Sequence, residues 1–371
     1  MACVPEVHRH IYSERDPLVS APQRDAAVPD DARVRDLIAW VTAVLGSADF
    51  TISVASADAS FRRYFRITRD DETWVAMDAP PGKEDVGPYV RIADMLVSTG
   101  VNAPRVLERN VQQGFLLSSD LGSRTYLMQL SIGGSAESLY GDAIAALVKI
   151  QAGGAQYLHE LPPYDDALLR REMDLFPEWF CGRHLGLLLT PQDRTGLQGV
   201  FDVLAREALQ QPRVFVHRDY HSRNLMVCDG ARQGANPGIL DFQDAVAGAV
   251  TYDVVSLLRD CYIAWPIERV HAWALQFREQ ARTAGVETGS DAGEFLRWLD
   301  LMGVQRHLKA IGIFARLWHR DGKRGYLRDI PRTLKYVRDV SGEYRELAFL
   351  ARFIDARVQP ALAHTDAAPT P

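Results

Sequence analysis

Two acidic residues and an asparagine in the middle of the chain are spaced as phosphoryl transfer requires. The segment His217–Asn224 reads His-Arg-Asp-Tyr-His-Ser-Arg-Asn and fits the H-R-D-x-x-x-x-N pattern of a kinase catalytic loop. Asp241 follows a second apolar run and corresponds to the aspartate of the D-F-G pattern, although Gln243 replaces the glycine. In this chemistry Asp219 accepts the proton of the attacking hydroxyl, while Asn224 and Asp241 offer oxygen ligands to Mg²⁺. The motif therefore predicts an ATP-dependent kinase.

These residues need rigid supports, and three short apolar runs stand beside them. Val214–Val216 precedes the loop, Leu225–Val227 follows it, and Gly238–Leu240 leads into Asp241. Each run is too short for a helix and is bounded by polar residues, which is typical of short strands. We expect these strands to bring the reactive groups to one point.

An α+β segment precedes the motif. Helical spacing of apolar residues predicts a helix over 31–45. Aromatic and β-branched residues at 61–67 and 74–77, separated by a polar turn, predict an antiparallel hairpin. A helix at 88–99 and a strand at 111–118 complete a small sheet-containing lobe.

The rest of the chain is mostly helical. Periodic apolar residues predict helices at 135–152, 165–189, 192–210, 252–261, 267–284, 292–318 and 333–356. The predicted fold class is α+β, in a protein-kinase-like two-lobe arrangement: an N-lobe at 31–117, a hinge at 118–122 and a helical C-lobe at 123–359. We expect residues 1–30 to be a flexible extension and the small, polar, proline-bearing residues 360–371 to be a disordered tail.

Composition restricts the partners of the chain. Its 371 residues carry a formal net charge of −6, which argues against nucleic acid, since that partner needs a clustered basic face. No apolar run reaches about 18 residues and no signal-peptide pattern occurs, so we expect no membrane span. The four cysteines are scattered, as in a reduced cytoplasmic protein. We predict a cytoplasmic protein for which no obligate protein partner is evident.

The N-lobe lacks the usual means of holding ATP phosphates. Protein kinases pair a strand lysine with a helix glutamate, but Met77 stands near the lysine position and 88–99 contains no glutamate. The candidates for the missing positive charge are Arg62, Arg63, Arg66 and Lys83. A solvated strand face would explain the three arginines equally well. Small residues ending at Ser60 would let backbone N–H groups approach the phosphates.

Several segments together resemble the aminoglycoside phosphotransferase superfamily. They are the catalytic loop, Leu240–Phe242 and Thr251–Asp260. A closer resemblance, to the anomeric sugar kinases of cell-wall recycling, rests on Asp58–Arg66, Met77–Pro81, Asp120–Tyr126 and Gln305–Arg316. Those enzymes phosphorylate the 1-hydroxyl of N-acetylmuramate and N-acetylglucosamine with ATP. The resemblance covers roughly residues 30–355 and makes the missing lysine a trait of the subfamily.

The resemblance implies roles for further residues. His217 and Asp253 would brace the catalytic loop, and Arg223 would act beside Asp219. The nucleotide-binding residues would be Ser60, Arg62, Arg63, Met77, Leu117, Ser118, Ser119, Asp120 and Leu121. The sugar pocket would draw on Arg223, Gln243, Asp244, Arg259, Asp260, Gln305, Arg306 and His307. Arg259 or Arg306 could bind the lactyl carboxylate of N-acetylmuramate, and a surface ion pair is the alternative for both.

The predicted function is an ATP- and Mg²⁺-dependent kinase of the anomeric hydroxyl of N-acetylmuramate or N-acetylglucosamine, in peptidoglycan recycling. One alternative is another small-molecule kinase of the superfamily, with an aminoglycoside, choline-like or homoserine-like substrate. The arginine and histidine at 305–307 favour instead a neutral or anionic sugar. The other alternative is a catalytically inactive nucleotide-binding scaffold, against which the presence of the base and both metal ligands argues.

Overall fold

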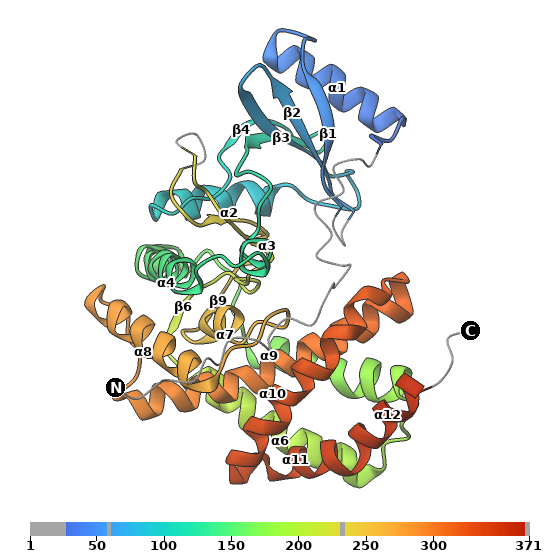
Figure 1. Ribbon diagram of the computed structural model, residues 1–371, viewed down its shortest axis with the longest axis vertical. Coiled ribbons are helices and arrows are strands. Elements are labelled where there is room, and N and C mark those ends of the chain that lie inside the picture. The colour runs from blue at the N-terminus through green and yellow to red at the C-terminus, as the bar shows by residue number, and fades with distance from the viewer. Residues whose placement is uncertain (1–26, 58–60, 231–233, 368–371) are drawn as a thin grey trace, which may run out of the picture.

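The chain forms a smaller lobe built on a sheet and a larger helical lobe (Figure 1). The computed structural model describes residues 27–57, 61–230 and 234–367. The smaller lobe contains a five-stranded antiparallel sheet of order β1-β2-β3-β5-β4. Its strands are β1 (Thr51–Ala57), β2 (Arg63–Arg69), β3 (Glu72–Asp78), β4 (Val106–Asn110) and β5 (Phe115–Ser119). The predicted two-lobe α+β arrangement is therefore present.

Helix α1 (Ala32–Leu45) covers the outer face of this sheet (Figure 1). Asp31 caps its start by accepting a hydrogen bond of 3.0 Å from the Val34 N–H, and Gly46 ends it with a φ of 65°. The helix and the sheet share a core of their own, made of Val34, Leu37, Val41, Phe65, Ile67, Ala76, Phe115 and Leu117.

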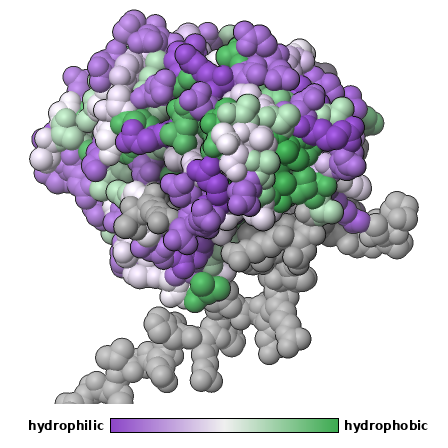
Figure 2. Space-filling view, turned by 90° about the horizontal axis from the view of Figure 1, so that it is seen from above, coloured by the Kyte–Doolittle hydropathy of each residue, from purple (hydrophilic) through white to green (hydrophobic). Residues whose placement is uncertain are grey.

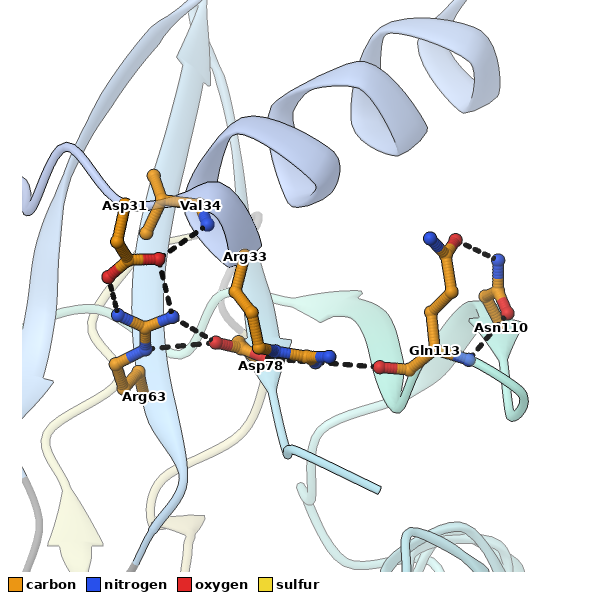
Figure 3. A network of polar contacts seen from close by, with 7 residues as sticks. All are labelled: Asp31, Arg33, Val34, Arg63, Asp78, Asn110 and Gln113. Carbon is orange, nitrogen blue, oxygen red and sulfur yellow. Dashed lines mark hydrogen bonds and ion pairs between the residues drawn. The ribbon is translucent and has the colours of Figure 1, made fainter. Parts of the chain in front are cut away.

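A buried aspartate attaches α1 to the sheet (Figure 3). Asp78, at the end of β3, accepts hydrogen bonds of 2.9 Å from the Nε atoms of Arg33 and Arg63. Arg63 also pairs with Asp31, and Arg33 donates to the carbonyl oxygen of Gln113 at 2.6 Å. The hydrogen bond from Arg63 is the main reason that the pKa of Asp31 lies low, at about 2. These contacts fix the helix on the sheet.

Helix α2 (Gly87–Ser98) lies between the sheet and the larger lobe (Figure 1). Its buried side chains share the main hydrophobic core with Met77 and Leu116 of the sheet. The same core continues into the helical lobe, so the two lobes are joined by packing as well as by the chain.

The larger lobe is mostly helical. Its α-helices are α3 (Tyr126–Ser131), α4 (Ala136–Gly153), α5 (Asp166–Met173), α6 (Pro191–Gln210), α7 (Tyr252–Leu258), α8 (Ile267–Thr283), α9 (Ala292–Asp321), α10 (Ile330–Glu343), α11 (Ala348–Phe353) and α12 (Gln359–Ala367). Shorter 3-10 or π-helical segments are η1 (Gly154–Tyr157), η2 (Phe176–His184), η3 (Arg324–Asp329), η4 (Arg345–Leu347) and η5 (Ile354–Val358). Helix α9 is the central element, because α6, α7, α10 and η2 all pack against it.

Two small antiparallel pairs position the catalytic motif. Strand β6 (Arg213–Val216) pairs with β9 (Val246–Ala249), and β7 (Leu225–Met226) pairs with β8 (Gly238–Ile239). These ladders bring the end of β6, the start of β7 and the end of β8 to one region. The three short strands expected from the sequence are present, and β9 is an additional partner.

Several expectations differ from the structure. The hairpin is present as β2 and β3, while β1 and β4 are additions to the expected sheet. A single helix over 165–189 is wrong, because α5 gives way to the π-helical η2 and then to irregular chain. A single helix over 333–356 is also wrong, since α10, η4 and α11 divide it. Disorder from residue 360 is wrong as far as α12 extends, and residues 1–26 and 368–371 lie outside the described residues.

The surface over the smaller lobe is mixed in character. Seen from above, hydrophilic residues predominate and hydrophobic residues form small groups between them (Figure 2). The exposed large hydrophobic side chains of the described residues are Phe61, Leu107, Val111, Ile132, Leu188, Leu209, Ile267 and Leu275. None of the helices in the described ranges has the length and apolar character needed to cross a membrane.

Candidate active site

The loop between β6 and β7 carries the predicted catalytic residues. Asp253, buried in α7, accepts hydrogen bonds from the backbone N–H of His217 at 2.7 Å and of Arg218 at 3.0 Å. Arg218 has a φ of 79°, a left-handed conformation that is uncommon for a residue with a side chain. Strained backbone of this kind persists where its surroundings enforce it. The Asp253 carboxyl group supplies that enforcement, although burial raises its pKa to about 7.

The side chains of His217 and Asp260 also support the catalytic loop. The Asp219 N–H donates to Nδ1 of His217 at 3.3 Å, and burial lowers the pKa of His217 to about 4, so the imidazole is neutral. Asp260 accepts hydrogen bonds from the N–H of Ser222 at 3.0 Å and of Tyr262 at 2.9 Å. Both oxygens of Asp260 therefore accept backbone hydrogen bonds, and a contact of Asp260 with the sugar stays a prediction.

A buried cluster of charges lies behind Asp219. Lys309 of α9 lies 3.1 Å from the Glu172 carboxylate and donates to the Tyr252 hydroxyl at 3.0 Å. Arg218 pairs with the same carboxylate at 2.5 Å. Burial would raise the pKa of Asp219, but the neighbouring positive charges, Lys309 foremost, hold it below its ordinary value. Asp219 is therefore ionised near neutral pH, as a proton acceptor must be.

Asn224 and Asp241 lie side by side beyond β7 and β8. The Asn224 Nδ2 donates to Asp241 Oδ2 at 3.2 Å and to the Asp219 carbonyl oxygen at 3.0 Å. Asp241 has a φ of 63°, and Gln243 donates to its Oδ1 at 2.9 Å. The structure thus gives Gln243 a supporting place beside Asp241, and its role in the sugar pocket stays a prediction.

The oxygen atoms of this pair fit Mg²⁺. Among the residues that the structure describes, no group of three or more His, Cys, Asp or Glu side chains could hold a metal ion. Asn224 and Asp241 therefore do not belong to a metal site made entirely of protein ligands. Mg²⁺ is ordinarily held by one or two carboxylates together with substrate phosphates, and an aspartate with an amide oxygen suits that arrangement.

A cavity of about 490 Å³ lies between the lobes and ends at this pair. The sheet contributes Ala55, Tyr64, Arg66 and Val75, α2 contributes Tyr89, and the segment before β4 contributes Pro104. The end of β5 and the connection between the lobes contribute residues 118–123. The helical lobe contributes Thr125, Leu127, Met128, Arg223, Asn224, Met226, Leu240 and Asp241. Apolar walls with a few polar groups at one end are typical of a small-molecule site.

An ion pair sets the position of the connection between the lobes. Arg66 Nε and Nη2 donate to the two oxygens of Asp120 at 2.6 and 3.0 Å, and Nη2 also donates to the Gly122 carbonyl oxygen at 2.8 Å. The Asp120 side chain is only 4% exposed. Two parallel bonds of this kind fix direction as well as distance. The segment expected to face a nucleotide, Ser118–Leu121, lies along the cavity wall.

Leu117 and Met77, two of the residues expected to bind the nucleotide, do not line the cavity. Leu117 pairs with Ala76 across the sheet, and both belong to the core under α1. Because neighbouring residues of a strand face opposite sides, the adjacent pair of Val75 and Ser118 faces the cavity instead. Met77 faces the same side as Val75 but lies in the main core. Leu117 and Met77 therefore lie in the cores outside the cavity lining, and their contact with a nucleotide stays a prediction.

The expected arginines of the N-lobe are engaged elsewhere. Arg63 is held by Asp31 and Asp78, as Figure 3 shows, and does not line the cavity, so its nucleotide role stays a prediction. Arg62 pairs with Glu84 at 3.1 Å and does not line the cavity. Ser60 lies outside the described residues.

Three residues expected in the sugar pocket are buried in the helical lobe. Arg259 pairs with Asp300 at 2.5 Å and is 3% exposed. His307 lies 2.8 Å from the Arg259 carbonyl oxygen, and Gln305 donates to the Tyr164 hydroxyl at 3.3 Å. These contacts satisfy internal groups of the fold, and sugar contacts of Arg259, Gln305 and His307 stay predictions.

Arg306 and Asp244 are the last two residues expected in the sugar pocket. Arg306 is 5% exposed and its closest recorded donor contact is to the Cys261 sulfur at 3.9 Å. Its charge faces the carboxylates of Asp219 and Asp260. Asp244 is exposed, and its carboxylate accepts a hydrogen bond of 3.4 Å from Gln243. Neither side chain lines the cavity.

Sequence reasoning missed Lys309, Glu172 and Tyr262. Lys309 lies one helical turn after Arg306, so both reach the same side of α9. A buried lysine in an apolar helix is a signal that could have been noticed. Glu172 and Tyr262 carry no such signal, because their partners come from distant parts of the chain.

Comparison with known proteins agrees with this geometry. A profile of the phosphotransferase enzyme family matches residues 51–291. The chain is 45% identical over 347 residues to the N-acetylmuramate/N-acetylglucosamine kinase of Pseudomonas aeruginosa, covering 90% of this chain and 99% of the relative. A kinase of the same name from Pseudomonas putida is 46% identical over 327 residues, covering 87% of this chain and 93% of the relative.

The fold is also found among solved structures. The GDP complex of wild-type aminoglycoside 2'-phosphotransferase-IIIa matches with a TM-score of 0.58 at 14% identity, covering 85% of this chain and 100% of that one. The two-lobe fold and the site at Asp219, Asn224 and Asp241 define a protein-kinase-like phosphotransferase with a hydroxyl acceptor. The chain belongs to the phosphotransferase enzyme family. The predicted fold class and the resemblance to the aminoglycoside phosphotransferases are confirmed.

Proposed function

We propose that this protein transfers the γ-phosphoryl group of ATP to the anomeric hydroxyl of N-acetylmuramate and N-acetylglucosamine. The observation that carries the proposal is geometric: Asn224 donates to the Asp219 carbonyl oxygen at 3.0 Å and to Asp241 at 3.2 Å, and Asn224 and Asp241 line a cavity of about 490 Å³. Relatives of 45% and 46% identity, whose names state both sugars, support the choice of acceptor.

The chemistry follows from the placement of the residues. The base of ATP would lie against Val75 and Leu240, with its phosphates directed to Asn224 and Asp241. Bound Mg²⁺ supplies neutralisation of charge on these phosphates. The 1-hydroxyl oxygen attacks the γ-phosphorus while Asp219 accepts its proton. The bond from the γ-phosphorus to the bridging oxygen breaks, and ADP and the sugar 1-phosphate leave.

The supporting residues act by position. His217 and Asp253 hold the loop so that Asp219 faces the acceptor side. Residues 118–121 offer backbone groups to the base along the cavity wall. The product would feed UDP-sugar synthesis in the cytoplasm, as part of peptidoglycan recycling. An aminoglycoside acceptor is less well supported, since the relatives of 45% and 46% identity are named for the two amino sugars.

A coupled ADP-release assay tests the proposal. We expect turnover with N-acetylmuramate and N-acetylglucosamine and none with kanamycin. Asp219→Asn should lower kcat by about a thousandfold while ADP binding persists, because it removes the proton acceptor and not the nucleotide site. Asp321→Asn, at the exposed end of α9, is the matched control. Turnover with kanamycin alone would contradict the sugar assignment, and an active Asp219→Asn protein would contradict the base.

A further inference from the structure

Arg223 occupies a distinctive position at the mouth of the active site. It precedes Asn224 on the catalytic loop and lines the cavity. Its Cζ atom lies 3.7 Å from the centre of the Tyr262 ring and 5.7 Å from the centre of the Tyr326 ring. Within the described part of the chain, no hydrogen bond or salt bridge to its guanidinium group is recorded. The cation therefore rests on aromatic faces, and the Asp329 carboxylate is close enough to interact with its charge.

The aromatic rings under Arg223 form a supported platform. Phe314 of α9 stacks with Tyr326 at 5.7 Å between ring centres and contacts Tyr262 at 6.3 Å. Phe314 is buried, so Tyr262, Tyr326 and Phe314 together form an aromatic platform that is anchored in the core. The platform joins three elements: the segment after α7, helix α9, and η3.

The Asp260 carboxylate binds both the aromatic platform and the catalytic loop. Asp260 accepts a hydrogen bond from the Tyr262 N–H and another from the Ser222 N–H, one residue before Arg223. Asp260 is fully buried. The ring that carries the guanidinium and the loop that carries Arg223 and Asp219 are therefore fixed relative to one another.

A guanidinium held in this way is prepared to bind an anion. Stacking on an aromatic face restrains the plane of the group and leaves its N–H donors at the edge. Those donors match the two oxygens of a carboxylate in a bidentate pair. The aromatic platform thus reduces the loss of side-chain freedom that an arginine ordinarily undergoes on binding.

Three other arginines of the helical lobe, Arg259, Arg332 and Arg306, contact internal groups of the fold. Arg259 is paired with Asp300 in the interior. Arg332 donates to the Cys261 carbonyl oxygen at 2.8 Å and lies 3.5 Å from Asp329. Arg306 is nearly enclosed beside Cys261. Arg223 differs from these three because it lines the cavity.

From this arrangement we infer that Arg223 is the specificity-determining residue that binds the carboxylate of an acidic amino sugar. The inference rests on the proposed function. N-acetylmuramate differs from N-acetylglucosamine by a lactyl ether on O3, which carries the carboxylate. The lactyl-bearing C3 lies two ring bonds from C1, and Arg223 lies four residues after Asp219 on the same loop, so a sugar with its 1-hydroxyl at Asp219 would present its carboxylate toward Arg223. The pair of sugars therefore differs in one contact, and that contact is to Arg223.

The test compares the two sugars in each variant. The measured quantity is the ratio of kcat/KM for N-acetylmuramate to kcat/KM for N-acetylglucosamine. A loss that affects both sugars cancels in this ratio. Arg223→Gln should lower the ratio by about 10- to 100-fold, the value of a charge-assisted pair. Arg223→Lys should lower it by less, and Arg194→Gln on the exposed face of α6 is the control for a lost charge.

Two further measurements examine the platform and the carboxylate separately. Tyr262→Leu should lower the ratio while Tyr262→Phe preserves it, because the phenyl face suffices for stacking. The methyl ester of N-acetylmuramate removes the negative charge without any mutation. The wild-type protein should prefer the acid to the ester, and Arg223→Gln should lose that preference.

Several outcomes would overturn the inference. An unchanged ratio in Arg223→Gln, or wild-type protein that treats acid and ester alike, excludes a carboxylate contact. A shift of the ratio in Arg306→Gln but not in Arg223→Gln would transfer the contact to Arg306. Equal losses for both sugars would assign Arg223 to the phosphoryl group. Absence of ADP release with either sugar in the wild-type protein would instead contradict the proposed function.

Discussion

The Asp253 carboxyl group accepts a hydrogen bond of 2.7 Å from the backbone N–H of His217, which begins the catalytic loop. A second bond of 3.0 Å runs to Asp253 from the N–H of Arg218, the residue with a φ of 79°. A side chain from α7 therefore holds the strained backbone just before Asp219. The position of Asp219 therefore depends on a fully buried residue that does not line the cavity.

Replacing Asp253 by asparagine should separate support from chemistry. The amide would turn one N–H group toward a backbone N–H and leave that donor unsatisfied. We expect the free energy of unfolding to fall by about 1–3 kcal/mol and kcat to fall with it. Urea unfolding and steady-state kinetics measure both, with Asp321→Asn as an exposed control. A fully stable and active variant would show that the loop keeps its shape without this carboxylate.

His217 should make stability depend on pH. Burial lowers its pKa in the folded state to about 4, whereas the unfolded chain has the ordinary value of 6.5. The unfolded state therefore binds a proton first as the pH falls, and the folded state loses stability between pH 6.5 and 4. The expected loss is about 3 kcal/mol, from the difference between the two pKa values. His217→Gln should lose less stability over this range, and parallel curves for the two proteins would contradict the assignment.

Lys309 should control the acid limb of the pH–rate profile. Burial raises the pKa of Asp219, and Lys309 is the foremost charge that lowers it. Lys309→Met should therefore raise that pKa, and the acid limb of kcat/KM should move to higher pH by roughly half to one unit. Lys335→Met, on the exposed face of α10, is the matched control. A profile that stays in place would show that other charges suffice.

Gln243 should affect the metal through Asp241. Its Nε2 donates to Asp241 Oδ1 at 2.9 Å, so its removal frees the carboxylate to turn. Gln243→Leu should weaken the apparent Mg²⁺ affinity by about 10- to 100-fold, as loss of an outer partner commonly does. Titration of activity with Mg²⁺ at saturating ATP measures the effect, and Gln198→Leu on α6 serves as control. An unchanged Mg²⁺ dependence would show that Asp241 needs no such partner.

Arg66 should act on nucleotide binding more than on the sugar. Its loss would leave the Asp120 carboxylate buried without its partner and release the chain at Gly122. Arg66→Leu should raise the Kd for ADP by about tenfold, since the wall of the cavity would shift. The KM for the sugar should change less. Arg69→Leu on the same strand is the control, because Arg69 lies over Trp74 away from the cavity.

Much of the fold follows from local patterns, with clear exceptions. The hairpin of β2 and β3 and the strands around the catalytic loop have apolar runs of their own. Strand β1 reads Thr-Ile-Ser-Val-Ala-Ser-Ala, and β4 is mostly polar. Both lie at the edges of the sheet, where pairing with a neighbour matters more than the strand's own hydrophobicity. Helix α12 was not predicted either, because its small residues show little helical periodicity of hydrophobicity.

Two of the predicted reactive groups, Asp219 and Asn224, lie within one short motif, whereas Asp241 follows a separate strand. The spacing in His217–Asn224 is that of a proton acceptor and a metal ligand in a kinase loop, which few other functions require. Their sequence by itself determined that a hydroxyl receives a phosphoryl group. The pairing of side chains was not predictable, because each arginine had several carboxylates available.

Tertiary structure alone decided those pairings. Arg66 binds Asp120 across 54 residues, Arg63 is held by the buried Asp78, and Arg259 is paired with Asp300 in the interior. Which charge meets which depends on the packing of helices and strands that are far apart in the chain. The same packing left Arg223 on an aromatic platform beside the catalytic loop. A local motif thus determines the type of reaction. The choice of substrate depends on contacts between residues that only the folded chain brings together.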